Sequence, residues 1–280
     1  MSVYEAYELY IQKEIVERNG SIKTLKNYRC SLHSLLRAIG GDFDITYLTT
    51  ETVSVWYKFM CEMANSDTTI HHNLGRLRSV LKYLKRNGLN VLDYDFIDLP
   101  KIKQRIPSYI EPEEVRKTID ALPTLRDKAL VACLFSTGCR ISELLNLNRD
   151  DVKSREVVVL GKGSKYRTVF VSETAYGLLQ SYLRTRKDKN PALFISSQYR
   201  RITTSRVAQI IHIATAEAGI DKIVTPHTFR HSFATDLVKK GANIVAVKDL
   251  LGHVSINTTQ MYTHTNKPYL KDIYEKYHTI

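Results

Sequence analysis

The chain contains 280 residues, of which 43% are hydrophobic and 25% are charged. This composition is typical of a globular protein with large buried cores, and it excludes disordered, collagen-like and coiled-coil fibre proteins. At roughly 150 residues per domain, the length predicts about two domains. The chain carries 41 Lys and Arg against 29 Asp and Glu, a formal net charge of +12. That charge favours a polyanionic partner, either nucleic acid or an acidic membrane surface.

The cysteines and the N-terminal segment indicate the cellular compartment. The four cysteines lack the C-x-x-C spacing of a zinc site or redox pair, so we expect reduced thiols. The N-terminal segment lacks the basic and apolar regions of a signal peptide. No stretch approaches the roughly 18 apolar residues that a membrane span requires. We therefore expect a cytoplasmic protein without a membrane partner, and nucleic acid becomes the leading candidate.

Apolar residues at helical spacing predict four amphipathic helices in the first part of the chain. The first begins at Ser2, which forms a capping-box pattern with Glu5. The second begins near Ser21 and ends at Gly40, where the backbone can turn left-handed. The third is centred on Trp56, and the fourth covers about residues 67–86. Short connections between them favour a compact helical bundle, a domain of residues 1–100.

The pattern changes after residue 100. Residues 101–109 contain basic side chains between prolines, which is typical of an interdomain linker. Helices are predicted near 112–122 and 125–137, a β-hairpin with strands at 156–160 and 168–171, and further helices from about 173. We expect a second domain over 110–280, so the fold class is mainly α with a small antiparallel sheet.

Two segments of the second domain place charged side chains at turns. Arg140 follows a glycine in T-G-C-R-I-S-E-L, and Glu143 lies three residues further on, where its carboxylate can orient the guanidinium. Lys162 lies between two glycines at the expected hairpin tip, where the backbone can approach a large ligand closely.

Two later segments add histidines, a second arginine and a tyrosine. His227 and Arg230 lie one helical turn apart in H-T-F-R-H-S-F-A-T, so both can face the same point. His253 follows in L-G-H, and Tyr262 comes nine residues later in T-T-Q-M-Y-T-H.

These residue types suit attack on a phosphodiester. Planar guanidinium groups bind the non-bridging oxygens and stabilise the charge of the transition state. Histidine can donate hydrogen bonds or accept the nucleophile's proton near neutral pH, and a lysine can protonate the leaving oxygen. A tyrosine whose pKa is lowered by cations can form a covalent phosphodiester that conserves the bond energy. Such a reaction needs neither a metal nor ATP, and no cofactor is expected.

Taken in series, these motifs resemble those of the tyrosine recombinases, the phage integrase family, and are most like the Xer type. The resemblance is dense in the second domain and covers the first only in outline. It implies a helical, SAM-like core-binding domain before a tyrosine recombinase catalytic domain. It also implies cutting and rejoining of double-stranded DNA at a specific site, through a 3′-phosphotyrosine, a free 5′-hydroxyl and a four-stranded junction.

The resemblance also implies a role for each motif residue. Tyr262 would be the nucleophile, and Arg140 and Arg230 would clamp the scissile phosphate, supported by Glu143. Lys162 would be the general acid, His227 the general base or a hydrogen-bond partner, and His253 a second donor to the phosphate. This sequence departs from the family at Cys139, where a bulkier aliphatic residue is common, and we expect that change to affect packing alone.

Several features have more than one interpretation. His227 and His231 have the spacing of a zinc pair, but Thr228 stands where the H-E-x-x-H motif needs Glu, so no metal is expected. Basic residues on helices two and four form either a solvated face or a DNA-contacting face, with the linker closing a clamp around the duplex. The basic residues in question are Lys23, Lys26, Arg29, Arg76 and Arg78.

The C-terminal segment and the biological role also remain open. Residues 268–280 carry an apolar stripe that either folds back on its own domain or, as the resemblance implies, is exchanged with a neighbouring protomer in a DNA-bound tetramer. The length leaves no room for an arm-binding domain, which favours Xer-like resolution of chromosome or plasmid dimers, a role in chromosome segregation. The alternatives are DNA integration by a small mobile element, a non-cleaving DNA-binding accessory protein, and a type IB topoisomerase.

Overall fold

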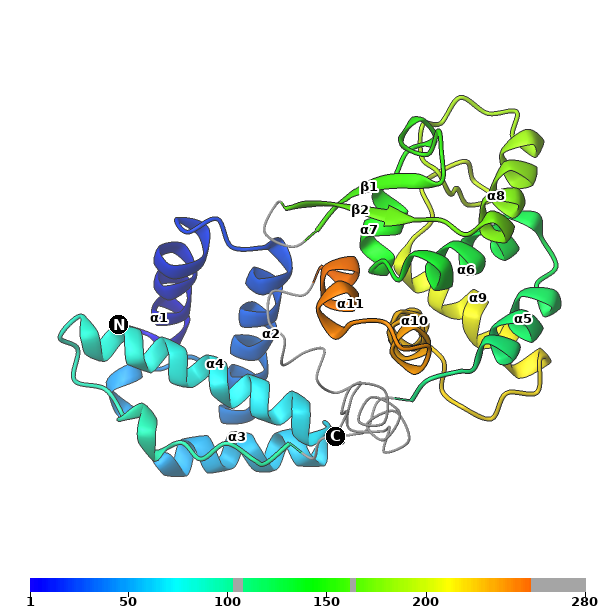
Figure 1. Ribbon diagram of the computed structural model, residues 1–280. Helices are drawn as coiled ribbons and strands as arrows, with labels where there is room; N and C mark the ends of the chain where they lie inside the picture. The colour runs from blue at the N-terminus through cyan, green and yellow to red at the C-terminus, as the bar shows by residue number, and fades with distance from the viewer. Residues whose placement is uncertain (103–107, 162–164, 253–280) are drawn as a thin grey trace, which may run out of the picture. The chain divides into compact units, whose positions relative to one another are not determined.

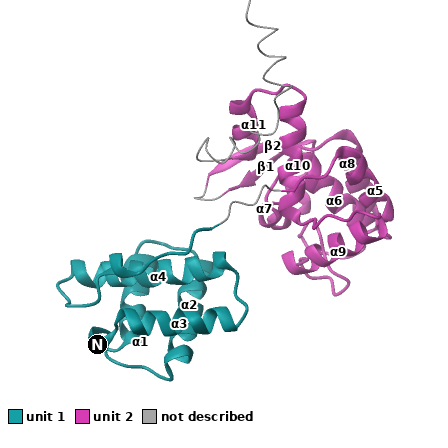
Figure 2. Cartoon of the chain, turned by 90° about the horizontal axis from the view of Figure 1, so that it is seen from below, with its two compact units in different colours: residues 1–105 teal, residues 106–280 magenta. Residues whose placement is uncertain are grey.

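The computed structural model describes residues 1–102, 108–161 and 165–252. The chain divides into two compact units, residues 1–105 and residues 106–280 (Figure 2). Each unit has its own hydrophobic core. In the described ranges, no helix is both long enough and apolar enough to cross a lipid bilayer.

The first unit is an all-helical bundle (Figure 1). Its apolar stripes meet around Trp56, which is fully buried and donates its indole N–H to the Ser34 hydroxyl at 3.0 Å. Its elements are α1 (Val3–Tyr10), the π-helix η1 (Ile11–Val16), α2 (Ile22–Ile39), η2 (Ile45–Tyr47), α3 (Thr50–Glu62), α4 (Asp67–Arg86) and η3 (Tyr94–Phe96).

The helix boundaries of this unit follow the caps read from the sequence. Ser2 and Glu5 form the expected capping box, Ser21 caps α2, and Gly40 ends α2 with a φ of 81°. The first helix differs from expectation, because it continues after Tyr10 as a π-helix whose last turn is closed by a bond from the Glu17 N–H to the Gln12 carbonyl. Within these wider turns, Ile11 and Ile15 remain buried against the rest of the first unit.

The second unit is built around α6 (Leu125–Thr137), whose side chains are buried on nearly all sides. This explains why its pattern is apolar all round instead of amphipathic. Helices α5, α8 and α10 pack against it. The remaining elements are α5 (Pro112–Ala121), α7 (Ile141–Asn146), η4 (Arg149–Asp151), β1 (Glu156–Leu160), β2 (Tyr166–Phe170), α8 (Glu173–Thr185), α9 (Thr204–Glu217), α10 (Pro226–Lys239) and α11 (Ile244–Leu251).

Strands β1 and β2 form a two-stranded antiparallel sheet, which confirms the expected fold class of a mainly helical protein with a small sheet. β2 begins at Tyr166, two residues earlier than the sequence indicated, because Leu160 pairs with Tyr166 and the Gly161 N–H donates to the Lys165 carbonyl at 2.8 Å. One face of the sheet is buried through Val157, Val159 and Val169. Arg167 lies on this same inward face, where it pairs with Val159 of β1.

Candidate active site

The turn between α6 and α7 positions Arg140. Gly138 ends α6 with a φ of 59°, in the left-handed region that favours glycine, and Arg140 is the N-cap of α7. The backbone N–H of Arg140 donates to one oxygen of Glu143 at 2.9 Å, and its guanidinium donates to the other at 2.7 Å. One carboxylate therefore binds both the backbone N–H and the guanidinium of Arg140 and orients the side chain, as the sequence predicted for Glu143.

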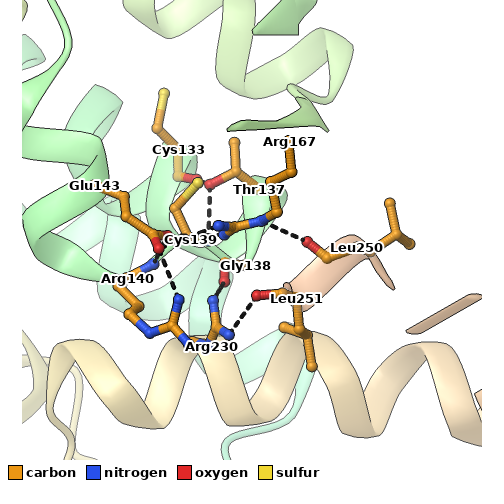
Figure 3. A network of polar contacts seen from close by, with 10 residues as sticks. All are labelled: Cys133, Thr137, Gly138, Cys139, Arg140, Glu143, Arg167, Arg230, Leu250 and Leu251. Carbon is orange, nitrogen blue, oxygen red and sulfur yellow. Dashed lines mark hydrogen bonds and ion pairs between the residues drawn. The ribbon is translucent and has the colours of Figure 1, made fainter. Parts of the chain in front are cut away.

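Glu143 is also bound by a second arginine. Arg167 on β2 donates to both carboxylate oxygens of Glu143, at 3.1 and 2.7 Å (Figure 3). Burial alone would raise the pKa of Glu143, but the hydrogen bonds from Arg167 and Arg140 outweigh it and lower the pKa to about 2. The carboxylate is thus ionised at neutral pH and lies between two guanidinium groups.

Arg230 reaches the same turn from α10. Its side chain is almost fully buried, and it donates to the Gly138 carbonyl at 2.7 Å and to the Leu251 carbonyl at 2.6 Å (Figure 3). Thr225 caps α10 and Pro226 occupies its first turn, where a missing N–H costs no helical hydrogen bond. Arg230 therefore links the turn before Arg140 to the end of α11.

His227 lies on the first turn of α10, where it is partly buried but still open to solvent. Partial burial, followed by the positive charges of Arg230 and Arg140, lowers the pKa of His227 below its usual value of 6.5. Both arginines are thus close enough to act on this ring electrostatically. The structure brings Arg140, Arg230, His227 and Glu143 into one site.

Three of the sequence-derived site residues, Lys162, His253 and Tyr262, lie outside the described residues. Two glycines that precede them are described, and both lie against Arg167. A Cβ atom on Gly161 would be 3.3 Å from the Arg167 guanidinium, and a Cβ on Gly252 would be 2.9 Å from its Cδ. The chain therefore enters the Lys162 segment and the His253 segment next to the same arginine.

Arg167 was missed as a site residue in the sequence analysis, although it ends the motif G-K-G-S-K-Y-R. The available signal was its place in β2, where alternation puts a charged residue on the inward face between apolar neighbours. A buried arginine needs a carboxylate or carbonyl partner. Arg167 has both, because its Nε also donates to the Leu250 carbonyl at 3.1 Å.

The cysteine beside the site has a packing role. Cys139 is buried, and burial is the main cause that raises the pKa of its thiol. This agrees with the expectation that its difference from the family affects packing.

His231 is buried and packs edge-on against Tyr109 at 6.5 Å between ring centroids. In the described part of the chain, no group of three or more His, Cys, Asp or Glu side chains is arranged to hold a metal ion.

The basic residues of the first unit divide into two sets. Lys23 and Lys26 are exposed on α2, whereas Arg29 is paired with Glu8 through two bonds of 2.8 Å. Arg78 donates to Asp95 and to the Ile97 carbonyl, which engages it in the packing of η3 against α4.

Arg76 faces a different environment, a polar groove of about 360 Å³ between α2 and α4. It donates to the Asn73 side chain at 2.7 Å. Amides, hydroxyls and an imidazole line the groove with it, a set of donors and acceptors of the kind that reads base edges. The groove is lined by Asn27, Cys30, Ser34, Asn65, Thr69, His72, Asn73 and Arg76.

Comparison with known proteins identifies the family. The model of the phage integrase family matches residues 108–268. The chain belongs to the phage integrase family.

Its relatives extend the match over both units. The tyrosine recombinase XerD of Oceanobacillus iheyensis is 34% identical over 281 residues, covering 94% of each chain. The crystal structure of XerA recombinase is 28% identical, with a TM-score of 0.55 over 99% of both chains. The Tn1549 transposon integrase in complex with a circular intermediate DNA is 19% identical, with a TM-score of 0.81 over 99% of both chains, and shares the fold.

These findings confirm the resemblance stated from the motifs, a tyrosine recombinase most like the Xer type. They also support an enzyme that carries out site-specific DNA strand exchange over the alternatives of an accessory protein or a mobile-element integrase.

Proposed function

We propose that Tyr262 attacks the scissile phosphodiester within the site formed by Arg140, Arg230 and His227. A bond forms between the tyrosine oxygen and phosphorus while the bond to the 5′ oxygen breaks. His227 accepts the tyrosine proton, and Lys162 donates a proton to the leaving 5′ oxygen. The phosphotyrosine linkage keeps the energy of the broken bond, so a 5′-hydroxyl from another strand can reverse the step and complete the exchange.

One observation carries this proposal. Arg230 reaches the turn before Arg140 through its bond to the Gly138 carbonyl, and His227 lies one helical turn before Arg230 on α10. Burial, and then the charges of these two guanidinium groups, lower the pKa of His227. Paired arginines can bind both non-bridging oxygens of a phosphate and stabilise the charge of the transition state. A lowered pKa keeps the imidazole neutral at pH 7, the state in which it can accept a proton. Glu143 holds Arg140 in place for this task.

We propose that both units bind double-stranded DNA, because both are basic. Residues 1–105 contain 15 Lys and Arg against 12 Asp and Glu, and residues 106–280 contain 26 against 17. In the first unit, the exposed Lys23 and Lys26 would contact phosphates, and the groove beside Arg76 would contact bases. His253 is proposed as a further donor to the scissile phosphate.

We propose further that the active assembly is a tetramer on DNA, with residues 268–280 exchanged between protomers, and that its task is Xer-like resolution of chromosome or plasmid dimers. The 34% identity to XerD, over 94% of each chain, supports this role. Deleting residues 268–280 should leave binding of a single site intact but reduce assembly and recombination. A fully active truncated chain would contradict the exchange.

The test of the chemistry uses a nicked duplex: the chain's own binding site, mapped by footprinting on host DNA and nicked beside the scissile phosphate. The nick lets the short fragment that carries the freed 5′-hydroxyl diffuse away. Rejoining is then impossible, and the covalent intermediate is trapped. The full-length chain should form a covalent adduct whose linked peptide contains Tyr262, in the presence of a chelator. Tyr262→Phe should bind the duplex with unchanged affinity and form no adduct.

Two outcomes would replace this function with another. Binding without any adduct from the natural sequence would indicate an accessory protein. An adduct accompanied by supercoil relaxation, but without recombination of two directly repeated sites on one plasmid, would indicate a topoisomerase.

A further inference from the structure

We propose that Arg167 is a positioning residue that keeps Arg140 available to the DNA phosphate, by supplying a second positive charge to Glu143. The inference rests on the proposed role of Arg140 and adds a residue to it. Arg167 would act through the carboxylate, without contacting the DNA itself.

The three side chains form a series from the interior of the unit to its surface. The side chain of Glu143 is 4% exposed, that of Arg167 is 12% exposed and that of Arg140 is 35% exposed. Glu143 therefore has an inner and an outer arginine, and only the outer one has a substantial surface open to a ligand. A phosphate approaching from solvent meets Arg140 first.

The charges of the three groups decide how strongly Arg140 can bind an anion. A single carboxylate paired with Arg140 alone would cancel most of its charge toward a phosphate. Because Arg167 binds both oxygens of the same carboxylate, one negative charge is shared between two positive ones and the group as a whole stays positive. The shared carboxylate can orient Arg140 while leaving it the potential that an anionic transition state requires.

Arg167 is itself held in a fixed position. Its Nε donates to the Leu250 carbonyl at 3.1 Å, near the C-terminal end of α11, where a positive charge is favourable. Gly252 leaves no room for a larger residue, because a Cβ there would lie 2.9 Å from the Arg167 side chain. The guanidinium thus directs its Nε–H toward α11 and its two terminal nitrogens toward Glu143.

A partly buried arginine of this unit provides a contrast. Arg201 donates to the Leu147 carbonyl at 2.8 Å and to the Asn148 side chain at 2.7 Å. These bonds stabilise a loop and include no carboxylate shared with a proposed phosphate ligand. Arg201→Gln is therefore a matched control, because it removes a partly buried guanidinium of the same unit without touching Glu143.

The experiment is a double-mutant cycle with Arg167→Gln, Glu143→Gln and the two combined. The single-turnover rate of adduct formation is measured on the nicked duplex at saturating protein, and the affinity for the duplex is measured separately. Arg167→Gln should slow adduct formation by roughly 10- to 100-fold, the range typical of residues that orient a functional group. The affinity should change far less, since Arg167 makes no proposed DNA contact.

The diagnostic result is the rate of the double variant. In the Glu143→Gln background there is no carboxylate charge for Arg140 and Arg167 to share. Arg167→Gln should therefore add no more than about a twofold effect in that background. Arg201→Gln should have the same effect, large or small, in both backgrounds. If the defects of Arg167→Gln and Glu143→Gln multiply as those of Arg201→Gln do, Arg167 has only a structural role and the inference is wrong.

Two further measurements keep the outcomes distinct. Thermal unfolding shows whether each variant is folded, and Arg167→Met, which removes the charge but keeps a long side chain, replaces Arg167→Gln in the cycle if the latter does not fold. If the natural sequence itself binds the duplex and forms no adduct, the proposed function fails. If it forms the adduct but Arg167→Gln cleaves at the natural rate, only the positioning role fails.

Discussion

Arg230 donates a hydrogen bond of 2.7 Å to the carbonyl oxygen of Gly138, although 92 positions separate the two residues in the chain. The bond fixes α10 to the turn that presents Arg140. It depends on the backbone conformation of Gly138, whose φ of 59° aims the carbonyl toward α10. The two proposed phosphate ligands are therefore positioned relative to one another through a single peptide group.

Gly138→Ala should uncouple this arrangement. A Cβ at this position would lie 2.4 Å from the ring of Phe233, on the same helix as Arg230, in addition to the cost of a positive φ. We expect a loss of roughly 2–4 kcal/mol in the free energy of unfolding and a loss of adduct formation. Gly219→Ala is the control, because its φ is 68° with no atom within 4 Å. It should cost only about 1 kcal/mol. Equal costs for the two variants would contradict the predicted clash.

Arg140→Lys should reduce adduct formation on the nicked duplex by on the order of 100- to 1000-fold, as for the loss of one donor to a transition-state oxygen. The ammonium keeps the charge but cannot bind Glu143 and a phosphate oxygen with the same planar group. Single-turnover rates at saturating protein separate this effect from weaker binding. A rate within threefold of the natural chain would remove Arg140 from the proposed clamp.

His227 predicts the pH dependence of cleavage. Its pKa is lowered from 6.5, so the imidazole is neutral at pH 7, and it becomes protonated only as the pH falls below 6.5. If the neutral ring accepts the tyrosine proton, the cleavage rate should be constant near pH 7 and should decline below pH 6.5. His227→Asn should lower the rate by about 100-fold or more and abolish that decline. A decline that persists unchanged in His227→Asn must come from another group.

Glu143→Gln should destabilise the second unit by about 3 kcal/mol at pH 7, because it leaves buried Arg167 without its counter-charge. The pKa of Glu143 falls from 4.5 in the unfolded chain to about 2 in the folded one. Its contribution to stability is therefore present above pH 4.5 and lost as the pH falls from 4.5 toward 2. The difference in unfolding free energy between the natural chain and Glu143→Gln should shrink over that interval. Glu156→Gln, a change at an exposed position of β1, should give no comparable difference.

Charge reversal on α2 should distinguish the two sets of basic residues. Reversing Lys23 and Lys26 should weaken DNA binding and reduce the slope of log affinity against log salt, by about one for each phosphate that is no longer neutralised. Arg29→Gln should change that slope less, because Arg29 is already paired with Glu8. Unchanged affinity and slope after reversal of both lysines would show that this surface is merely solvated.

The sequence predicted most helix boundaries because they depend on local chemistry. The bounds of α4 were read correctly from its apolar spacing, and those of α2 from its serine cap and terminal glycine. The continuation of α1 as a π-helix was not foreseen, because the segment is short and the four-residue spacing of Ile11 and Ile15 also fits an α-helix. The start of β2 was misjudged, since strand register depends on a partner strand and on the hairpin closure at Gly161.

In the candidate site too, contacts between residues close in the sequence could be predicted, and contacts between distant residues could not. Glu143 could be assigned to Arg140 because the two lie three residues apart at a helix start. The contact of Arg167 with Glu143 could not be predicted, because the two residues meet only after β2 has paired with β1 and folded onto α7. The hydrogen bonds from Arg230 to the Gly138 and Leu251 carbonyls could not be predicted either, since every residue has a backbone carbonyl and the sequence does not mark which one accepts.

The end of α11 is tied down by two side chains from other elements, Arg167 at the Leu250 carbonyl and Arg230 at the Leu251 carbonyl. A pull on the chain beyond Gly252 would act on these two bonds and on the buried contacts of Val247 and Leu251 with α10. Tension applied there would be transmitted to β2 and to α10 at once. A partner that grips the C-terminal segment could thereby load the guanidinium groups mechanically, with no contact of its own to either arginine.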